Sequence, residues 1–288
     1  MTTTIKIENM DAALGARITG VDLARPVDSA TRDAIAKAWR DRLILVFPDQ
    51  NIRDDELIAF TRLFGDLDPP GPNPYGAPFL PEHPEINVIS NVMENGKPIG
   101  NLGAGEAIWH ADMTYIDVPP MGAVLLGLEI PKGEGNTYFA NMYAAHDEMP
   151  ADLMAAIKGR TCVHDATYNS AGMMRKGYKE VTDPREAPGA RHPLVIRHPY
   201  TGRDALFLGR RRNAYISGLG LAESEALLDA LWAYATQPQF AVTHVWNERD
   251  VLMWDNLATL HRRDGFTPTA RRVLHRTQIK GARALEAA

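Results

Sequence analysis

Short apolar runs, bounded by glycine, proline and polar residues, recur along most of the chain. Most of them are shorter than a helix needs, and many are rich in β-branched or aromatic residues, so they predict strands. The predicted strands cover residues 43–47, 86–90, 107–115, 122–130, 137–141, 193–199, 204–209, 239–246, 250–256 and 271–279. Because few helices separate them, the pattern argues against alternating strand–helix units and favours a β-sandwich or barrel with helical additions.

Helical periodicity is confined to a few segments. The predicted helices cover residues 30–41, 55–64, 143–158 and 222–235. Ser29 is the expected N-cap of the first helix, and Gly65 is the expected stop of the second. Many strands with a few flanking helices predict an α+β fold.

Two long segments fit neither pattern. Residues 66–84 are dense in proline and glycine, and residues 169–191 are irregular and charged. Loops of this length are often functional lids, although a plain surface excursion is equally compatible with the sequence. No internal repeat or linker divides the chain, so we expect a single domain over residues 1–288.

Composition narrows the classes of function. With 45% hydrophobic and 23% charged residues, the 288-residue chain can bury a substantial core. A formal net charge of −5 without a long basic run argues against nucleic-acid binding and favours a small-molecule partner. No apolar run is long enough for a membrane span or a secretory signal, so we expect a cytoplasmic protein. The single cysteine, Cys162, offers neither an internal disulfide nor a thiolate metal cluster.

The segment WHADMTY, residues 109–115, contains the first candidate for chemistry. Residues two apart on a strand point to the same face, so His110 and Asp112 can converge on one metal ion. His261, which is expected to follow an apolar strand and enter a turn, is the best candidate for a third ligand. Two imidazoles and one carboxylate leave coordination positions open, which suits non-haem Fe(II). Zinc accepts the same ligands, as in a hydrolase.

Downstream of His261, the segment RRVLHRTQI suggests an anion site. Arg272 and Arg276 share a strand face, whereas His275 points the other way. Burying two guanidinium groups is costly unless anions meet them, because arginine keeps its charge and pairs with carboxylates. The alternative is a solvated strand face with both arginines in water.

These motifs occur together in one known family. WHADMTYIDVPP, GNTYF, WDNLATLHR and RRVLHRTQI resemble, in order and spacing, the motifs of the taurine dioxygenase and 2,4-dichlorophenoxyacetate dioxygenase family. The resemblance extends over nearly the whole chain, as far as residue 279. It implies a double-stranded β-helix, which is a jelly-roll or cupin-like core with flanking helices. It also implies an enzyme that uses Fe(II), 2-oxoglutarate and O₂.

The resemblance assigns roles to matching residues. The implied iron ligands are His110, Asp112 and His261. Thr137 and Arg272 match the residues that hold the far carboxylate of 2-oxoglutarate, and Trp254 matches a tryptophan close to that cosubstrate. Arg276 matches an arginine that commonly pairs with the substrate anion. Relatives are often dimers or tetramers, so a homodimer or homotetramer is expected by analogy.

The substrate is less sharply indicated. The run Arg210, Arg211 and Arg212 departs from the taurine dioxygenase pattern, while the segment ISNV, which contains Asn91, looks more like the phenoxyacetate branch. We take Asn91 and Arg212 as further substrate-binding candidates; a solvated turn is the alternative for the three arginines.

A carboxylate, such as an aryloxyalkanoate, is therefore favoured over taurine, another alkylsulfonate or an alkyl sulfate. The implied reaction would convert 2-oxoglutarate and O₂ into succinate and CO₂, and hydroxylation of the substrate next to a heteroatom would lead to C–O or C–S cleavage. A zinc hydrolase and a non-catalytic jelly-roll binding module are the readings from other classes.

Overall fold

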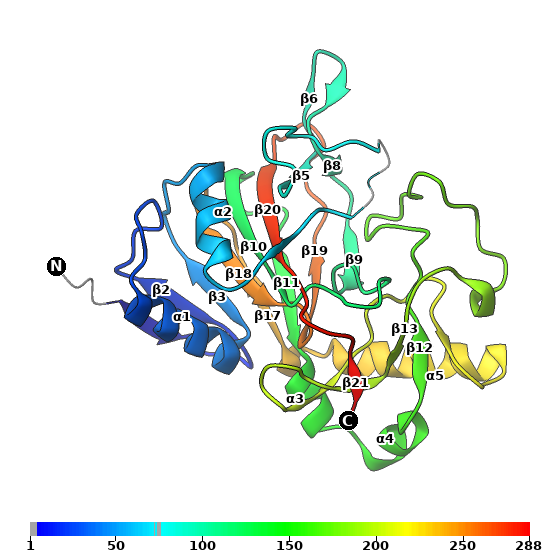
Figure 1. The fold of residues 1–288 in the computed structure, drawn as a ribbon. Coiled ribbons are helices and arrows are strands. Elements are labelled where there is room, and N and C mark those ends of the chain that lie inside the picture. Colours follow the sequence, from blue (N-terminus) through cyan, green and yellow to red (C-terminus); the bar gives the residue numbers. More distant parts are fainter. Residues whose placement is uncertain (1–4, 72, 74–75) are drawn as a thin grey trace.

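Two β-sheets make up the centre of the molecule (Figure 1). The computed structural model describes residues 5–71, 73 and 76–288. The predicted loop at 66–84 therefore lies partly outside the described residues, whereas the loop at 169–191 is described throughout. Within the described chain, no helix combines the length and the apolar character that crossing a membrane requires.

The larger sheet has the spatial order β1-β2-β3-β18-β10-β20-β5-β8, and β4 pairs with β20 beside this path. Its strands are β1 (Lys6–Asn9), β2 (Ala16–Thr19), β3 (Ile44–Phe47), β4 (Leu67–Asp68), β5 (Asn87–Ser90), β8 (Asn101–Leu102), β10 (Gly122–Glu129), β18 (Val251–Asp255) and β20 (Val273–Ile279). The pairs β2–β3 and β5–β8 are parallel, and the other pairs are antiparallel.

The smaller sheet has the order β17-β11-β19-β9 and is antiparallel throughout. Its strands are β9 (Ala107–His110), β11 (Thr137–Asn141), β17 (Ala241–His244) and β19 (Thr259–Arg263). It faces the larger sheet, because the rings of Phe139 on β11 and Trp254 on β18 lie 5.8 Å apart. Side chains alternate along each strand, so Leu125 and Leu274 enter this shared core.

The other face of the larger sheet packs against two helices, α1 (Ser29–Arg42) and α2 (Asp54–Arg62) (Figure 1). Val124 of β10 and Met253 of β18 meet Ile35 of α1 and Phe60 of α2 in that second core. Both faces of the central strands are thus buried, which explains why these strands are apolar at nearly every position rather than at alternate ones.

Two helix predictions need correction. The N-cap of α1 is Asp28 rather than Ser29, because the Asp28 carboxylate accepts a hydrogen bond from the Thr31 amide at 2.8 Å. The predicted helix at 143–158 is two helices, α3 (Met142–Asp147) and α4 (Ala151–Ile157). Pro150 precedes α4, and a proline there removes an amide donor and disfavours helical backbone at the residue before it.

Strands β6 (Met93–Glu94) and β7 (Lys97–Pro98) form a separate antiparallel hairpin, at the top of the view in Figure 1. The remaining elements form a layer toward the opposite end of the two sheets (Figure 1). They are β12 (Thr161–Val163), β13 (Arg191–Pro193), β14 (Val195–Arg197), β15 (Asp204–Leu206), β16 (Tyr215–Ile216), β21 (Glu286–Ala287), the helix α5 (Leu221–Ala235) and the 3₁₀ turns η1 (Pro184–Glu186) and η2 (Pro238–Phe240). The chain between β15 and β16 returns from this layer to the smaller sheet, where the Gly209 carbonyl accepts a hydrogen bond from the Ala111 amide at 2.9 Å.

Candidate active site

Strand pairing brings the two histidines together. His110 is the last residue of β9, and the register of the smaller sheet sets it directly opposite His261 on β19. Their rings lie 4.1 Å apart between centroids. His261 is therefore inside a strand and not in a turn after one, which corrects the sequence-based expectation of its position.

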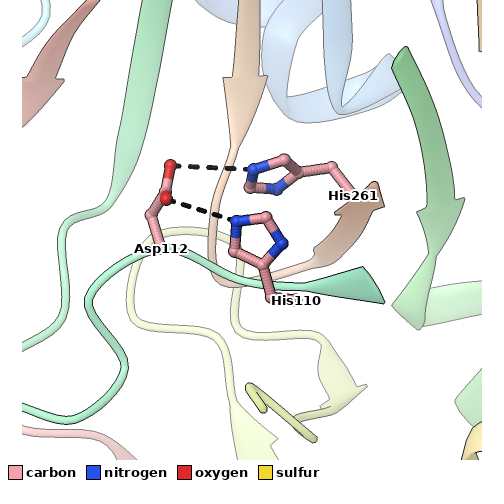
Figure 2. Close-up of side chains that lie close together, drawn as sticks. All are labelled: His110, Asp112 and His261. Carbon is pink, nitrogen blue, oxygen red and sulfur yellow. Dashed lines mark ion pairs between the residues drawn. The ribbon is translucent and has the colours of Figure 1, made fainter. Parts of the chain in front are cut away.

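Asp112 completes the cluster from a turn. We expected residues 107–115 to form one strand with His110 and Asp112 on the same face, but β9 ends at His110. The turn carries the Asp112 carboxylate back toward both rings. Its Oδ1 lies 3.7 Å from His110 Nε2 and its Oδ2 lies 3.8 Å from His261 Nε2 (Figure 2).

These three side chains have the donor set of a metal centre. One potential ligand atom from each lies within 4.8 Å of the others, and all three side chains are buried. His110 Nδ1 is 2.7 Å from the carbonyl of Ile108, to which it must donate. This fixes the proton on Nδ1 and leaves Nε2 unprotonated, with its lone pair available to a metal ion. The residues present therefore fit a two-histidine, one-carboxylate site.

The electrostatics keep these side chains in the protonation states that bind metal. Burial alone would raise the pKa of Asp112, but Arg276, whose Nη1 lies 2.7 Å from Asp112 Oδ2, is the main group that holds that pKa well below its usual range. Burial lowers the pKa of His110, and burial and His110 lower the pKa of His261 well below its usual range. At neutral pH the cluster is an ionised carboxylate and two neutral imidazoles.

Asn256 fixes the turn that carries Asp112. Its Oδ1 accepts from the Asp112 amide at 2.7 Å, and its Nδ2 donates to the carbonyls of Asp112 at 2.9 Å and Pro120 at 3.0 Å. Asn256 is buried and directly follows β18. Asn256 belongs to the motif WDNLATLHR, but nothing in that motif alone predicts this role.

We expect Asn256→Ala to weaken metal binding about 10- to 100-fold, as the loss of a group that orients a ligand commonly does. The reason is that the Asp112 backbone loses both hydrogen bonds that set its direction. Competition with a metal chelator measures the effect. Asn247→Ala is the matched control, because Asn247 lies in the turn before β18 and bonds Asp250 instead. An unchanged metal affinity in a natively folded Asn256→Ala protein would contradict this role.

A cavity adjoins His110 and His261 between the two sheets. Thr137, Trp254 and Arg272, the three residues expected near 2-oxoglutarate, all line it. Arg272 is 2% exposed, and its Nη2 donates to the Gly135 carbonyl at 3.1 Å. Its buried Nε has no hydrogen-bond partner within the described chain. Burial, and secondarily Arg263, lowers the pKa of Arg272 to about 9.

A second arginine and a tryptophan in this region were missed by the sequence analysis. Arg263 lines the same cavity, is 7% exposed, and also has a buried Nε without a partner in the part of the chain described. Trp246 donates from Nε1 to Thr137 Oγ1 at 2.9 Å, so the Thr137 hydroxyl proton is free to donate to a ligand. Two buried cations and a directed hydroxyl make this cavity a receptor for an anion.

A second cavity lies on the other side of Asp112. Arg276 lines both cavities, and its contact with Asp112 places it at the boundary between them. The expected common face of Arg272 and Arg276 is thus seen, and His275 faces away to pair with Asp54 at 2.6 Å.

Asn91 is not among the described residues that line these two cavities. Its amide donates to the carbonyls of Pro268 and Ala270, at 3.0 and 2.8 Å, and its Oδ1 accepts from the Arg272 amide at 3.1 Å. Its polar atoms therefore bond the backbone of the segment that leads into β20. The expectation that Asn91 binds substrate is not supported. The asparagines that do line the second cavity include Asn87 and Asn101.

The three consecutive arginines have three different environments. Arg210 lines the second cavity with Asp112. Arg211 points away, to Glu225 at 2.7 Å and Asp229 at 2.6 Å on α5. Arg212 lies over the ring of Tyr168, 3.4 Å from its centroid, and lines a smaller side cavity that Arg210 and His110 also touch. Arg212, the candidate from the sequence, is not among the described residues that line the second cavity.

The chain resembles known dioxygenases over its whole length. Residues 6–278 match the model of the family described as "Taurine catabolism dioxygenase TauD, TfdA family". The chain belongs to this family. An (S)-phenoxypropionate/alpha-ketoglutarate-dioxygenase of Sphingobium herbicidovorans is 34% identical over 301 residues, which cover 100% of this chain and 99% of the relative. An alpha-ketoglutarate-dependent 2,4-dichlorophenoxyacetate dioxygenase of Cupriavidus pinatubonensis is 32% identical over 270 residues, covering 91% and 92%.

Solved structures support the same membership. The crystal structure of AAD-2 in complex with Mn(II) and N-oxalylglycine has a TM-score of 0.79 and 28% identity to this chain, and the match covers 98% of this chain and 100% of that one. The family resemblance inferred from the motifs is therefore confirmed. So are the reaction class, an oxidoreductase of the dioxygenase type, and its requirement for Fe(II), 2-oxoglutarate and O₂.

Gly209 contacts both the site and the layer beside it: its carbonyl accepts from the Ala111 amide, and its α-carbon packs against His164. Its φ of +66° lies in the left-handed region, and a Cβ there would meet His164 Nδ1 at 2.0 Å. His164 is fully buried between Phe207 and His192, so it has no room to move. We expect Gly209→Ala to lower the free energy of unfolding by about 2–3 kcal/mol, through overpacking and backbone strain together.

Urea unfolding measures this loss. The control is Gly202→Ala, since Gly202 has a similar φ of +69° but open space around its missing Cβ. It isolates the backbone strain, which we expect to cost about 1 kcal/mol. Equal losses in the two variants would show that the contact with His164 contributes nothing.

Proposed function

We propose that His110, Asp112 and His261 hold Fe(II), and that the enzyme hydroxylates a small carboxylate-bearing molecule. The observation that carries this proposal is that the buried triad adjoins two cavities lined by buried arginines. Among the described residues that line these two cavities, Asp112 is the only one with a carboxylate. Bound iron and 2-oxoglutarate supply the oxidising chemistry, in which O₂ and 2-oxoglutarate give succinate, CO₂ and a hydroxylated substrate.

The cosubstrate occupies the cavity between the sheets. Arg272 pairs with the carboxylate of 2-oxoglutarate far from the metal, and the Thr137 hydroxyl donates to it. Trp254 and Phe139 form the apolar wall beside it and exclude water. Arg263 adds a second positive charge, which matches the double charge of 2-oxoglutarate.

The substrate occupies the second cavity, across Asp112. Arg276 is the residue there that pairs with a substrate carboxylate, while its contact with Asp112 keeps it beside the metal ligands. Relatives that act on phenoxypropionate and 2,4-dichlorophenoxyacetate support an aryloxyalkanoate or another alkoxyalkanoate. Hydroxylation of the carbon next to the ether oxygen gives a hemiacetal, which breaks down with cleavage of the C–O bond.

The same proposal includes the architecture. The two facing sheets correspond to a double-stranded β-helix of the jelly-roll or cupin-like type, in a single catalytic domain over residues 1–288. A cytoplasmic location, the absence of a nucleic-acid or membrane partner, and a homodimer or homotetramer stay predictions from the sequence. Gel filtration with light scattering tests the last of these.

Succinate release from 2-oxoglutarate by the Fe(II)-loaded protein in air tests the proposed function. We expect succinate formation to rise strongly with phenoxyacetate, 2-phenoxypropionate or other alkoxyalkanoates. A rise with taurine, other sulfonates or alkyl sulfates instead would keep the reaction class and replace the carboxylate substrate. Hydrolysis of a substrate without O₂ and 2-oxoglutarate would support the zinc hydrolase reading.

A further inference from the structure

The second cavity contains more positive charge than one carboxylate substrate explains. The arginines that line it are Arg175, Arg210 and Arg276, and Asp112 is the one acidic residue among the described lining residues. Because Arg276 already pairs with Asp112, the two remaining guanidinium groups have no carboxylate on the cavity wall. A buried cation without a carboxylate partner is costly, so a wall with two such cations indicates an anionic ligand.

Arg210 is the clearer of these two cations. It is 8% exposed, its Nε is buried, and no hydrogen bond or ion pair of its guanidinium is found within the described chain. The carboxylate of Asp165 also acts on Arg210 and lines the smaller side cavity with it, but no ion pair joins the two within the described chain, and the Asp165 oxygens already accept from Asn213 and from the Thr167 amide. Burial, and next the charge of Arg175, lowers the pKa of Arg210 to about 10.

The position of Arg210 is built into the fold. The residue before it, Gly209, bonds Ala111 between the metal ligands His110 and Asp112, so Arg210 follows directly from the turn that fixes the metal centre. Arg210 therefore reaches the cavity from the segment between β15 and β16, whereas Arg276 reaches it from β20.

Arg175 and Tyr115 extend this end of the cavity. Arg175 is 5% exposed, and its Nη1 donates to the carbonyls of Ala166 and Tyr168, at 2.6 and 2.7 Å. Its guanidinium carbon lies 4.2 Å from the centroid of the Tyr115 ring, and that of Arg210 lies 5.9 Å from the same centroid. Carbonyl dipoles and an aromatic face hold these cations in place without neutralising them.

We propose that the substrate carries two anionic groups, a carboxylate near Arg276 and a second anionic group at Arg210, supported by Arg175. The inference rests on the proposed function and narrows its substrate class to dianions such as alkoxy- or aryloxyalkanoates with a second carboxylate. Asn87, Asn101 and Ser170 on the wall add neutral hydrogen-bonding groups that suit a polar ligand.

Matched pairs of small molecules test the second anionic group. Calorimetric titration of the protein loaded with Mn(II) and N-oxalylglycine compares the dianion 4-carboxyphenoxyacetate with the monoanion 4-carbamoylphenoxyacetate, in which an amide replaces the ring carboxylate, and compares diglycolate with its monoamide. In at least one pair we expect the dicarboxylate to bind about 10- to 100-fold more tightly, as a charge-assisted contact allows. Equal affinities in both pairs, or no binding by any of the four, would overturn the proposal.

Two variants assign the preference to its residue. Arg210→Gln should abolish the preference for the dicarboxylate and leave the melting temperature equal or higher, because it removes an unpaired buried charge. Arg211→Gln is the matched control, since it removes the same charge one residue away on the side facing α5, and it should keep the preference. An Arg210→Gln protein that melts lower and keeps the preference would show a structural role for Arg210 and refute the inference.

Failure of this inference is distinguishable from failure of the proposed function. If phenoxyacetate and other monoanions stimulate succinate release while the dicarboxylates show no advantage, the dioxygenase assignment stands and the second anionic group is wrong. If no 2-oxoglutarate is consumed under any condition, the proposed function itself fails.

Discussion

Replacing His261 with alanine is expected to remove the metal centre. The variant should bind Fe(II) at least about 100-fold more weakly than the parent, which exceeds the usual effect of losing a group that only orients a ligand. The reason is that only two protein ligands, His110 and Asp112, would remain. The other coordination positions are those that 2-oxoglutarate and O₂ use, so no protein group replaces the lost imidazole. Succinate release should fall to background, measured with the iron content of each sample.

His275→Ala is the matched control for this prediction. His275 lies on β20, faces away from the cavity and pairs with Asp54 at 2.6 Å. Its loss should leave iron affinity unchanged. A His261→Ala protein that retains iron at the affinity of the parent would show that the ion is held elsewhere.

Replacing Arg272 with glutamine is expected to weaken the binding of 2-oxoglutarate without removing iron. A charge-assisted hydrogen bond of this kind contributes about 2–3 kcal/mol, so KM for 2-oxoglutarate should rise about 30- to 150-fold. The expected metal ligands lie on β9, in the turn after it and on β19, so iron affinity should change little. Initial rates of succinate formation over a wide range of 2-oxoglutarate concentrations measure the effect.

Arg271→Gln provides the control one residue away. Arg271 is exposed and pairs with Glu129 at 2.6 Å, outside the cavity. The KM for 2-oxoglutarate should remain that of the parent in this variant. A comparable KM increase in both variants would indicate a general disturbance of β20 rather than the loss of a specific contact.

The sequence contained enough information to name the family and the three residues of the cluster. His110, Asp112 and His261 could be named because the residue types of an iron site recur at characteristic spacings. Their mode of assembly could not, because it depends on the long-range register that pairs His261 with His110 and on the turn that ends β9. A local strand argument therefore named the three side chains that the fold brings together, but by a partly wrong geometry.

Contacts to the backbone account for the residues that were misjudged or missed. Asn91 looked like a ligand-binding amide, but its polar atoms are used by the backbone around Pro268, Ala270 and Arg272. Asn256 performs a similar function at Asp112. A sequence motif identifies such asparagines without saying whether they face a ligand or the chain.

The arginine run illustrates a second limit. Arg210, Arg211 and Arg212 are identical in chemistry, and extended backbone would give Arg210 and Arg212 one face. A hydrogen bond from Ala111 to Gly209, two acidic residues on α5 and the Tyr168 ring send the three side chains to different places. These partners come from distant parts of the chain, so no local pattern predicts them.

The central claim is that the triad and the Arg272 cavity together hold Fe(II) and 2-oxoglutarate in contact with each other. An anaerobic titration of the Fe(II)-loaded protein with 2-oxoglutarate tests it most directly, because chelation of Fe(II) by a 2-keto acid produces a visible charge-transfer absorption. We expect the band to saturate at one 2-oxoglutarate for each iron. Bound iron without any band, at 2-oxoglutarate concentrations far above that of the protein, would contradict the account.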